Sequence, residues 1–167
     1  GDLLLDGRLL VDNNLEKLCA KLDEKNVDLP CFGHYNLWRS DTFYRVDQGY
    51  HNLHGRWFPL WGKPKNKYFD AIPGLHHGQV PQGTTKAAIV DVSVIHRGFA
   101  TDEYIVEKYL RYKELGQKGW DLDRLIDEET LTVEHLPIGI LPKWFELSDI
   151  ADPTTKPKLI ELFTNIP

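Results

Sequence analysis

The residues best suited to chemistry are a histidine at the end of an apolar run and acidic residues set beside arginines and tryptophans. The run Ile89–Ile95 is rich in β-branched side chains, as buried strands are, and it delivers His96 to a turn that Gly98 permits. Proteins of the α/β class often place working groups where a strand ends and a helix follows. His96 is therefore a candidate functional residue, although a histidine at a strand end also serves as a hydrogen-bonded structural residue.

The segment after His96 predicts a helix. Thr101 suits the N-cap position, and Asp102 and Glu103 in the first turn suit the positive end of the helix dipole. Apolar and aromatic residues then recur at helical spacing until Gly116, namely Ile105, Val106, Tyr109, Leu110 and Tyr112.

The apolar run Leu3–Val11 is interrupted by Asp6, Gly7 and Arg8, and it has two interpretations. Asp-Gly between apolar runs favours a β-hairpin with a tight turn. Alternatively, Leu3–Leu5 is a buried parallel strand that places the Asp6 carboxylate at its carboxyl end. Local pattern alone favours the hairpin.

The remaining pattern predicts an α/β domain with a mainly parallel sheet, flanking helices and a long irregular, aromatic-rich loop. Residues 15–22 form an amphipathic helix capped by Asp12, Asn13 and Asn14, and residues 31–38 read as a strand with Phe32, His34, Asn36 and Trp38 on one face. Short helices are expected at 120–128 and 158–163. We expect the main portion to span residues 1–136, and residues 137–167 to form a proline-rich C-terminal strap.

The loop that follows the strand at 31–38 combines charged and aromatic residues in a way that suits a sugar or phosphate ligand. Surface ion pairs over a small apolar cluster would give the same composition. The residues concerned are Arg39, Asp41, Arg45 and Asp47, beside Trp38, Tyr44, Trp57 and Trp61.

Composition narrows the function classes. The net charge of −5 and the dispersed lysines and arginines argue against binding of nucleic acid. Cys19 and Cys31 are the only cysteines, and Cys19 lies on the apolar face of a predicted helix, which indicates thiols in a reducing compartment. The sequence has neither a bilayer-spanning apolar run nor a signal peptide, so we expect a cytoplasmic protein.

Three segments in order resemble the C-terminal part of family-2-like glycosyltransferases with the GT-A fold. IHRGFATDEYIVEKYLRYKELGQKGWDLDRLIDEETL resembles their His-x-Gly-Phe/Tyr strand end and the helix that follows it. NLWRSDTFYRVD resembles their acceptor-side segment, and LLLDGRLLVDNNLEKL resembles the strand, Asp-x-Asp motif and helix at their middle. The resemblance favours the strand interpretation of Leu3–Leu5 and implies a partial GT-A-like fold, without the N-terminal half that holds the nucleotide base.

Carried over to this sequence, the resemblance implies a transferase site with a divalent cation such as Mn²⁺ or Mg²⁺. Asp6 and His96 would hold the metal and the diphosphate of a nucleotide-sugar donor, and a carboxylate would deprotonate a saccharide or other hydroxyl acceptor. The implied catalytic residues are Asp47 and Asp41, and the implied substrate-binding residues are Trp38, Arg45, Arg8 and Trp61. An upstream domain or a second chain would complete the enzyme.

Two other functions remain open. One is a non-catalytic carbohydrate-binding or assembly module that uses the tryptophan and tyrosine side chains. The other is a metal-dependent hydrolase built on His34, His76, His77 and His96, for which the sequence offers enough histidines but no recognisable ligand spacing.

Overall fold

A computed structural model describes residues 3–47, 86–116 and 125–163 of the chain. Trp57, Trp61, His76 and His77 lie outside the described residues, as do most of the predicted aromatic-rich loop and residues 120–124 of the predicted helix at 120–128.

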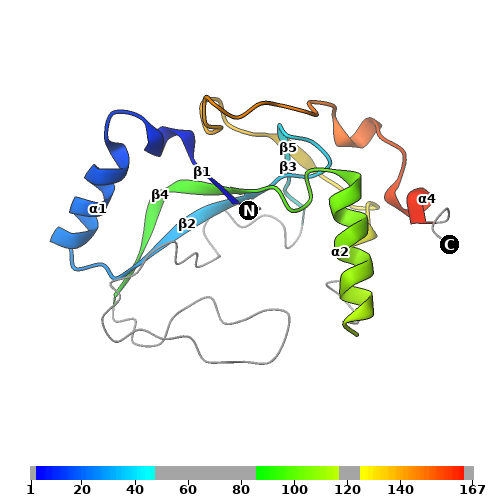
Figure 1. Cartoon of the computed structure of the whole chain (residues 1–167), viewed down its shortest axis with the longest axis horizontal. Coiled ribbons are helices and arrows are strands. Elements are labelled where there is room, and N and C mark those ends of the chain that lie inside the picture. The colour runs from blue at the N-terminus through cyan, green and yellow to red at the C-terminus, as the bar shows by residue number, and fades with distance from the viewer. Residues whose placement is uncertain (1–2, 48–85, 117–124, 164–167) are drawn as a thin grey trace.

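The described residues form a mixed α/β fold built on two small sheets (Figure 1). The larger sheet has the strand order β1 (Leu3–Leu5), β4 (Ala87–His96) and β2 (Leu29–Asn36). Strand β2 runs parallel to β4, whereas β1 runs antiparallel to it. The second sheet pairs β3 (Phe43–Arg45) with β5 (Val133–His135) in antiparallel fashion.

These pairings correct two expectations. The larger sheet is mixed rather than mainly parallel, because the short strand β1 enters against β4. Residues 133–135, for which the sequence pattern predicted no strand, form β5, because the backbone of Phe43–Arg45 pairs with them. The β-hairpin at Leu3–Val11 is also not formed, since Gly7–Leu10 is a 3₁₀ helix (η1).

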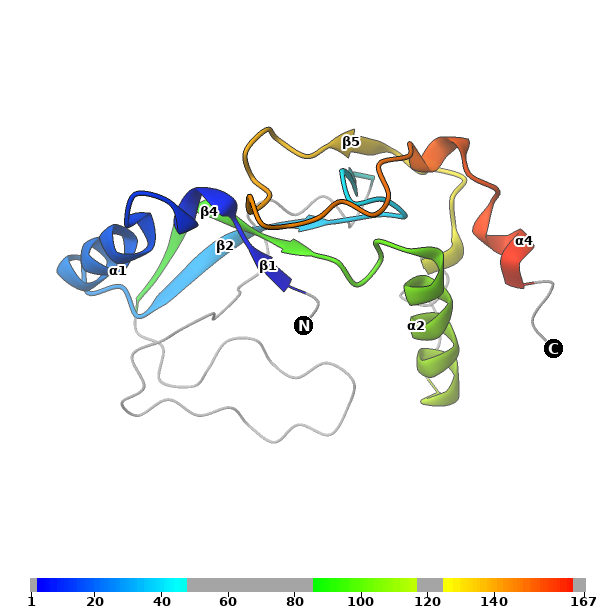
Figure 2. The same ribbon diagram turned by 45° about the horizontal axis from the view of Figure 1, so that its top comes forward.

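Helices cover the two ends of the larger sheet (Figures 1 and 2). Helix α1 (Asn14–Glu24) lies at one end, and α2 (Asp102–Glu114) lies at the other beside the short C-terminal helix α4 (Leu159–Phe163). The predicted cap of α2 is confirmed, since the Thr101 side chain accepts a hydrogen bond from the Tyr104 amide. Gly116, at φ +73°, follows the helix end as expected.

The C-terminal segment passes across the molecule from the side of η1 to α4 and includes the 3₁₀ helix η2 (Pro153–Thr155) (Figure 2). We call residues 137–158 the strap. The Gly7 amide donates a 2.6 Å hydrogen bond to the Ile140 carbonyl, so the strap is tied to η1. A Cβ atom on Gly7 would lie 2.6 Å from the Leu141 carbonyl oxygen, which makes this close approach possible only for glycine.

Three apolar clusters hold these elements together. One lies on the Tyr35 and Ile95 face of the larger sheet, the second packs the opposite face against α1, and the third joins α2 to α4 through Trp38. Their best-buried members are Leu37, Ile95 and Ile140 in the first cluster, Phe32 and Val94 in the second, and Trp38, Ile105 and Leu159 in the third.

None of the helices in the described part of the chain has the length and apolar character needed to span a bilayer. Cys19 and Cys31 are both free thiols, of which Cys31 is buried and Cys19 half-buried. Burial raises the pKa of the Cys31 thiol.

Candidate functional site

The carboxyl ends of the parallel strands β2 and β4 bring Asn36 and His96 together. The two residues are register partners, and Asn36 Oδ1 lies 2.9 Å from His96 Nδ1. Because an amide oxygen can only accept, Nδ1 carries the proton and the lone pair of a neutral His96 is at Nε2.

Helix α2 adds a lysine to this edge. Lys108 Nζ lies 3.5 Å from His96 Nε2 and 4.4 Å from the centroid of the Phe99 ring, so its ammonium group is placed against both rings. The His96 ring is fixed further by Phe99 in an edge-on contact at 5.1 Å and by the buried His34, which stacks on it at 5.3 Å. We call Asn36, His96, Gly98, Phe99 and Lys108 the His96 corner.

Gly98 makes the His96 corner sterically possible. A Cβ atom there would lie 2.0 Å from Lys108 Nζ and 2.5 Å from His96 Nε2. Gly98 is buried, and the polar ends of Lys108 and His96 occupy the volume that a side chain at this position would need.

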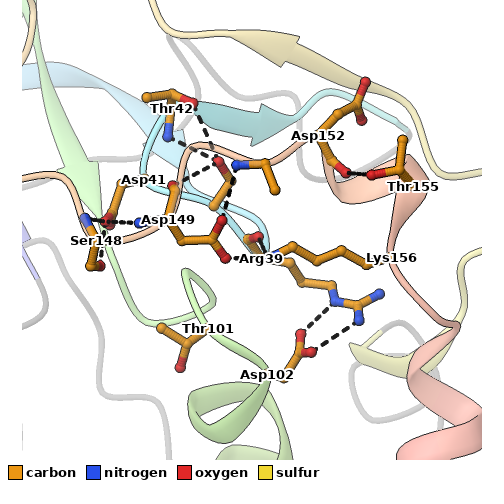
Figure 3. A network of polar contacts seen from close by, with 12 residues as sticks. Arg39, Asp41, Thr42, Thr101, Asp102, Ser148, Asp149, Asp152, Thr155 and Lys156 are labelled. Carbon is orange, nitrogen blue, oxygen red and sulfur yellow. Dashed lines mark hydrogen bonds and ion pairs between the residues drawn. The ribbon is translucent and has the colours of Figure 1, made fainter.

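A second polar network surrounds Arg39, which directly follows Trp38 (Figure 3). Its guanidinium group is 1% exposed, and it donates to both carboxylate oxygens of Asp102, at 2.5 and 3.1 Å, and to Glu128 at 3.0 Å. Burial alone would lower the pKa of Arg39, but the Asp102 and Glu128 carboxylates raise it above its ordinary value. Glu128 also accepts from the Leu159 amide at 2.7 Å. Arg39 thus joins the start of α2 to α4, and its partners satisfy its charge.

Asp41, proposed as a catalytic base, anchors the strap. Its Oδ2 accepts from the Ser148 amide at 2.7 Å, the Ser148 hydroxyl at 2.6 Å and the Asp149 amide at 3.2 Å (Figure 3). Arg97 Nη2 approaches its other oxygen at 3.5 Å. Lys156 holds the same region together by donating to the Arg39 carbonyl and to the Asp149 carboxylate. The Asp41 carboxylate is 2% exposed; its Oδ2 holds the strap, whereas its Oδ1 has no hydrogen-bond partner among the described residues.

Arg45, Asp47 and Trp38, expected near the acceptor, form one compact group. Arg45 Nε donates to Asp47 Oδ1 at 2.6 Å, Nη2 donates to the Asp127 carbonyl at 2.6 Å, and the guanidinium carbon lies 4.4 Å over the Trp38 ring. Since Trp38 is 0% and Arg45 1% exposed, both side chains build the interior. Neither offers a surface on which a saccharide could stack.

Asp6 and Arg8 form a separate corner at the end of β1. Asp6 is fully buried and accepts from the Arg8 amide at 2.9 Å, from Arg8 Nε at 2.9 and 3.0 Å, from Arg8 Nη2 at 2.5 Å and from the Ser93 amide at 3.3 Å. The hydrogen bond to Asp6 raises the pKa of Arg8. We call Asp6, Gly7 and Arg8 the Asp6 corner.

The structure does not bring Asp6 and His96 together. Leu3 is the register partner of His96, and the Asp6 amide donates to the Ser93 carbonyl. His96 lies three positions beyond Ser93 in β4, which is about 10 Å along a strand. Among the described residues there is also no cluster of three or more histidine, cysteine, aspartate or glutamate side chains placed to hold a metal ion.

Sequence reasoning did not single out Lys108. The signal was present, because Lys108 follows the fully buried Ile105 by three residues and so shares its face of the helix. A lysine on the buried face of the helix that follows a strand-end histidine indicates that the two side chains lie close together.

Comparison of the chain with protein-family models, with curated proteins and with solved structures found no significant match.

Proposed function

We propose that the chain is the donor-diphosphate and acceptor portion of a glycosyltransferase that uses a nucleotide-sugar donor, and that the His96 corner binds the diphosphate. The observation that carries the proposal is the basic pair His96 and Lys108 packed against Gly98 at the carboxyl ends of two parallel strands. Open α/β sheets commonly bind ligands at this edge, and lysine commonly binds phosphate groups.

The chemistry required of this corner is binding and charge neutralisation. When the bond between sugar and diphosphate breaks, negative charge grows on the leaving oxygen, and a nearby ammonium group stabilises it. Lys108 supplies such a group, and the Asn36 contact keeps the His96 ring in one orientation. An acceptor hydroxyl would still need a base, for which the resemblance offers Asp41 and Asp47. The free thiols Cys19 and Cys31 suit a reducing compartment, and we propose that the protein acts in the cytoplasm.

A second candidate, a non-catalytic binding module, is favoured by the pairing of the candidate bases. Asp41 is held by the strap and Asp47 by Arg45, so in this arrangement both carboxylates take part in structural contacts. Such a module would bind its ligand and leave it unchanged.

Calorimetric titration with uridine and guanosine diphosphate tests the proposal. The wild type should bind at least one of them, and His96→Ala should weaken binding about tenfold, because a hydrogen bond to a charged group contributes about 1.5–3 kcal/mol. His135→Ala is the matched control, since His135 lies on β5 in the second sheet.

Failure of the wild type to bind either diphosphate would contradict the proposal. Binding of saccharides in the absence of any nucleotide affinity would favour the binding module instead.

A further inference from the structure

The middle of the strap is packed into the protein only at its two ends. Within residues 143–151 no side chain is buried, whereas Pro142 before them and Pro153 after them both are. The apolar side chains of this segment add little to the core, since Trp144, Leu147 and Ile150 are 66%, 49% and 66% exposed. We call residues 143–151 the flap. A segment with so few buried apolar contacts can open while the rest of the molecule stays folded.

The contacts that hold the flap converge on Asp41 and its neighbour Ser40 (Figure 3). Asp41 Oδ2 accepts from the Ser148 amide at 2.7 Å, the Ser148 hydroxyl at 2.6 Å and the Asp149 amide at 3.2 Å. In the other direction, the Asp41 amide and the Ser40 hydroxyl donate to the Asp149 carbonyl at 2.6 and 3.2 Å. Each of these is a hydrogen bond that water can replace once the flap moves away, so opening has a modest cost.

Polar atoms under the closed flap are left without partners. Asp41 Oδ1 and Arg97 Nε are both buried, and neither makes a hydrogen bond to any of the described residues. Arg97 Nη2 lies 3.5 Å from Asp41 Oδ1, and the guanidinium carbon lies 4.7 Å over the ring of Phe145 in the flap. A buried polar atom without a partner costs free energy. The closed arrangement is therefore less favourable than its hydrogen bonds alone suggest, and opening would give both atoms access to water.

Backbone strain lies next to the same carboxylate. Arg39, two residues before Asp41, has φ +49°, in the left-handed region that residues with a Cβ atom rarely adopt. Lys156 donates to the Arg39 carbonyl and to the Asp149 carboxylate, so one ammonium group joins the strained residue to the flap. Strain of this kind is concentrated at segments that take part in function or change conformation.

We infer that the flap is a lid, which opens about Pro142 and Pro153 and uncovers the Asp41 carboxylate together with Arg97. In the closed arrangement the Ser148 hydroxyl donates to Asp41 as the hydroxyl group of a ligand would, and so it excludes such a ligand. The opening itself does not depend on the proposed function. The inference rests on that function in one respect only: the lid controls whether an acceptor hydroxyl reaches Asp41, one of the two candidate bases.

Labelling of carboxylates in the whole chain with a carbodiimide and glycine ethyl ester, followed by mass spectrometry, tests the opening. Asp6 is the internal reference, because it is a fully buried carboxylate held by Arg8 at the end of β1. We expect Asp41 to be labelled about tenfold faster than Asp6, since a lid opens more often than packed structure does. Ser148→Ala removes one hydrogen bond to Asp41 and should raise the labelling rate of Asp41 about tenfold, with Asp6 unchanged.

Thr155→Ala is the matched control. It removes a hydroxyl that donates to the Asp152 carbonyl at 2.7 Å, in the strap but outside the flap, and should leave the labelling rate of Asp41 unchanged. Labelling of Asp41 no faster than that of Asp6, or an unchanged Asp41 rate in Ser148→Ala, would overturn the inference. Because labelling needs no nucleotide, a failure to bind diphosphates would overturn the proposed function and leave the lid standing.

Discussion

Gly7 and Gly98 show how differently the Asp6 and His96 corners are built. A Cβ atom on Gly7 would meet the backbone of Leu141 and Pro142, whereas one on Gly98 would meet only the tips of Lys108 and His96. Backbone in the packed strap cannot move aside cheaply, but the end of a lysine can. The Asp6 corner therefore serves the fold, and the His96 corner leaves polar side-chain ends where a ligand could replace their contacts.

The charges of the two corners differ in the same sense. At the Asp6 corner a buried carboxylate and an arginine neutralise each other. At the His96 corner, Lys108 Nζ lies 3.5 Å from His96 Nε2, and His96 Nδ1 lies 2.9 Å from Asn36 Oδ1. A lysine is a group that can bind a phosphate.

Gly7→Ala should have the largest effect on stability. The new methyl group would lie 2.6 Å from the Leu141 carbonyl oxygen and would push the strap away from η1. We expect a loss of about 1–3 kcal/mol in the free energy of unfolding, as for other overpacked sites. Urea unfolding followed by circular dichroism measures it, and a variant as stable as the wild type would show that the Asp6 corner does not depend on this contact.

Acid should destabilise the strap, with a smaller loss in the free energy of unfolding than Gly7→Ala causes. Burial alone would raise the pKa of Asp149, but hydrogen bonds from Lys156 and the Ala151 amide outweigh it, and the pKa lies below its ordinary value of 3.8. A lowered pKa in the folded state means that the stabilisation is complete above the ordinary value and is lost as the pH falls through the lowered one.

The pH dependence of urea unfolding between pH 6 and pH 3 tests this contribution. The wild type should lose more stability over the acid end of this range than Asp149→Asn, which cannot titrate at that position. Equal losses in the two proteins would mean that the contact between Lys156 and Asp149 does not hold the strap.

Much of the fold could be predicted from local patterns. The β-branched run ending at His96, the Thr101 cap and the apolar spacing of residues 105–112 all report short-range structure, and β4 and α2 confirm them. The face of β2 that carries His34 and Asn36 was also predicted correctly, since alternation along a strand is a local property.

The direction and partners of the short strands could not be predicted. Three residues of β1 carry no signal that distinguishes parallel from antiparallel pairing, and a shift of one residue in register moves a side chain to the other face. The expectation that Asp6 and His96 lie together depended on the direction of β1 and on its register against β4. The pairing of Asp41 with the strap joins residues more than 100 positions apart, which no local pattern encodes.

Diphosphate binding by Gly98→Ala tests the central claim most directly, because the methyl group would displace the ends of Lys108 and His96 without removing either side chain. The backbone of Gly98 does not need a glycine conformation, but the Lys108 end and the His96 ring must both shift, so we expect a loss of about 1–2 kcal/mol in the free energy of unfolding. Binding is therefore measured at a temperature where the variant is folded. The account predicts affinity at least tenfold below that of the wild type, while Gly7→Ala, studied at a temperature where it is folded, binds like the wild type. Wild-type affinity in Gly98→Ala would contradict the assignment of the binding site to the His96 corner.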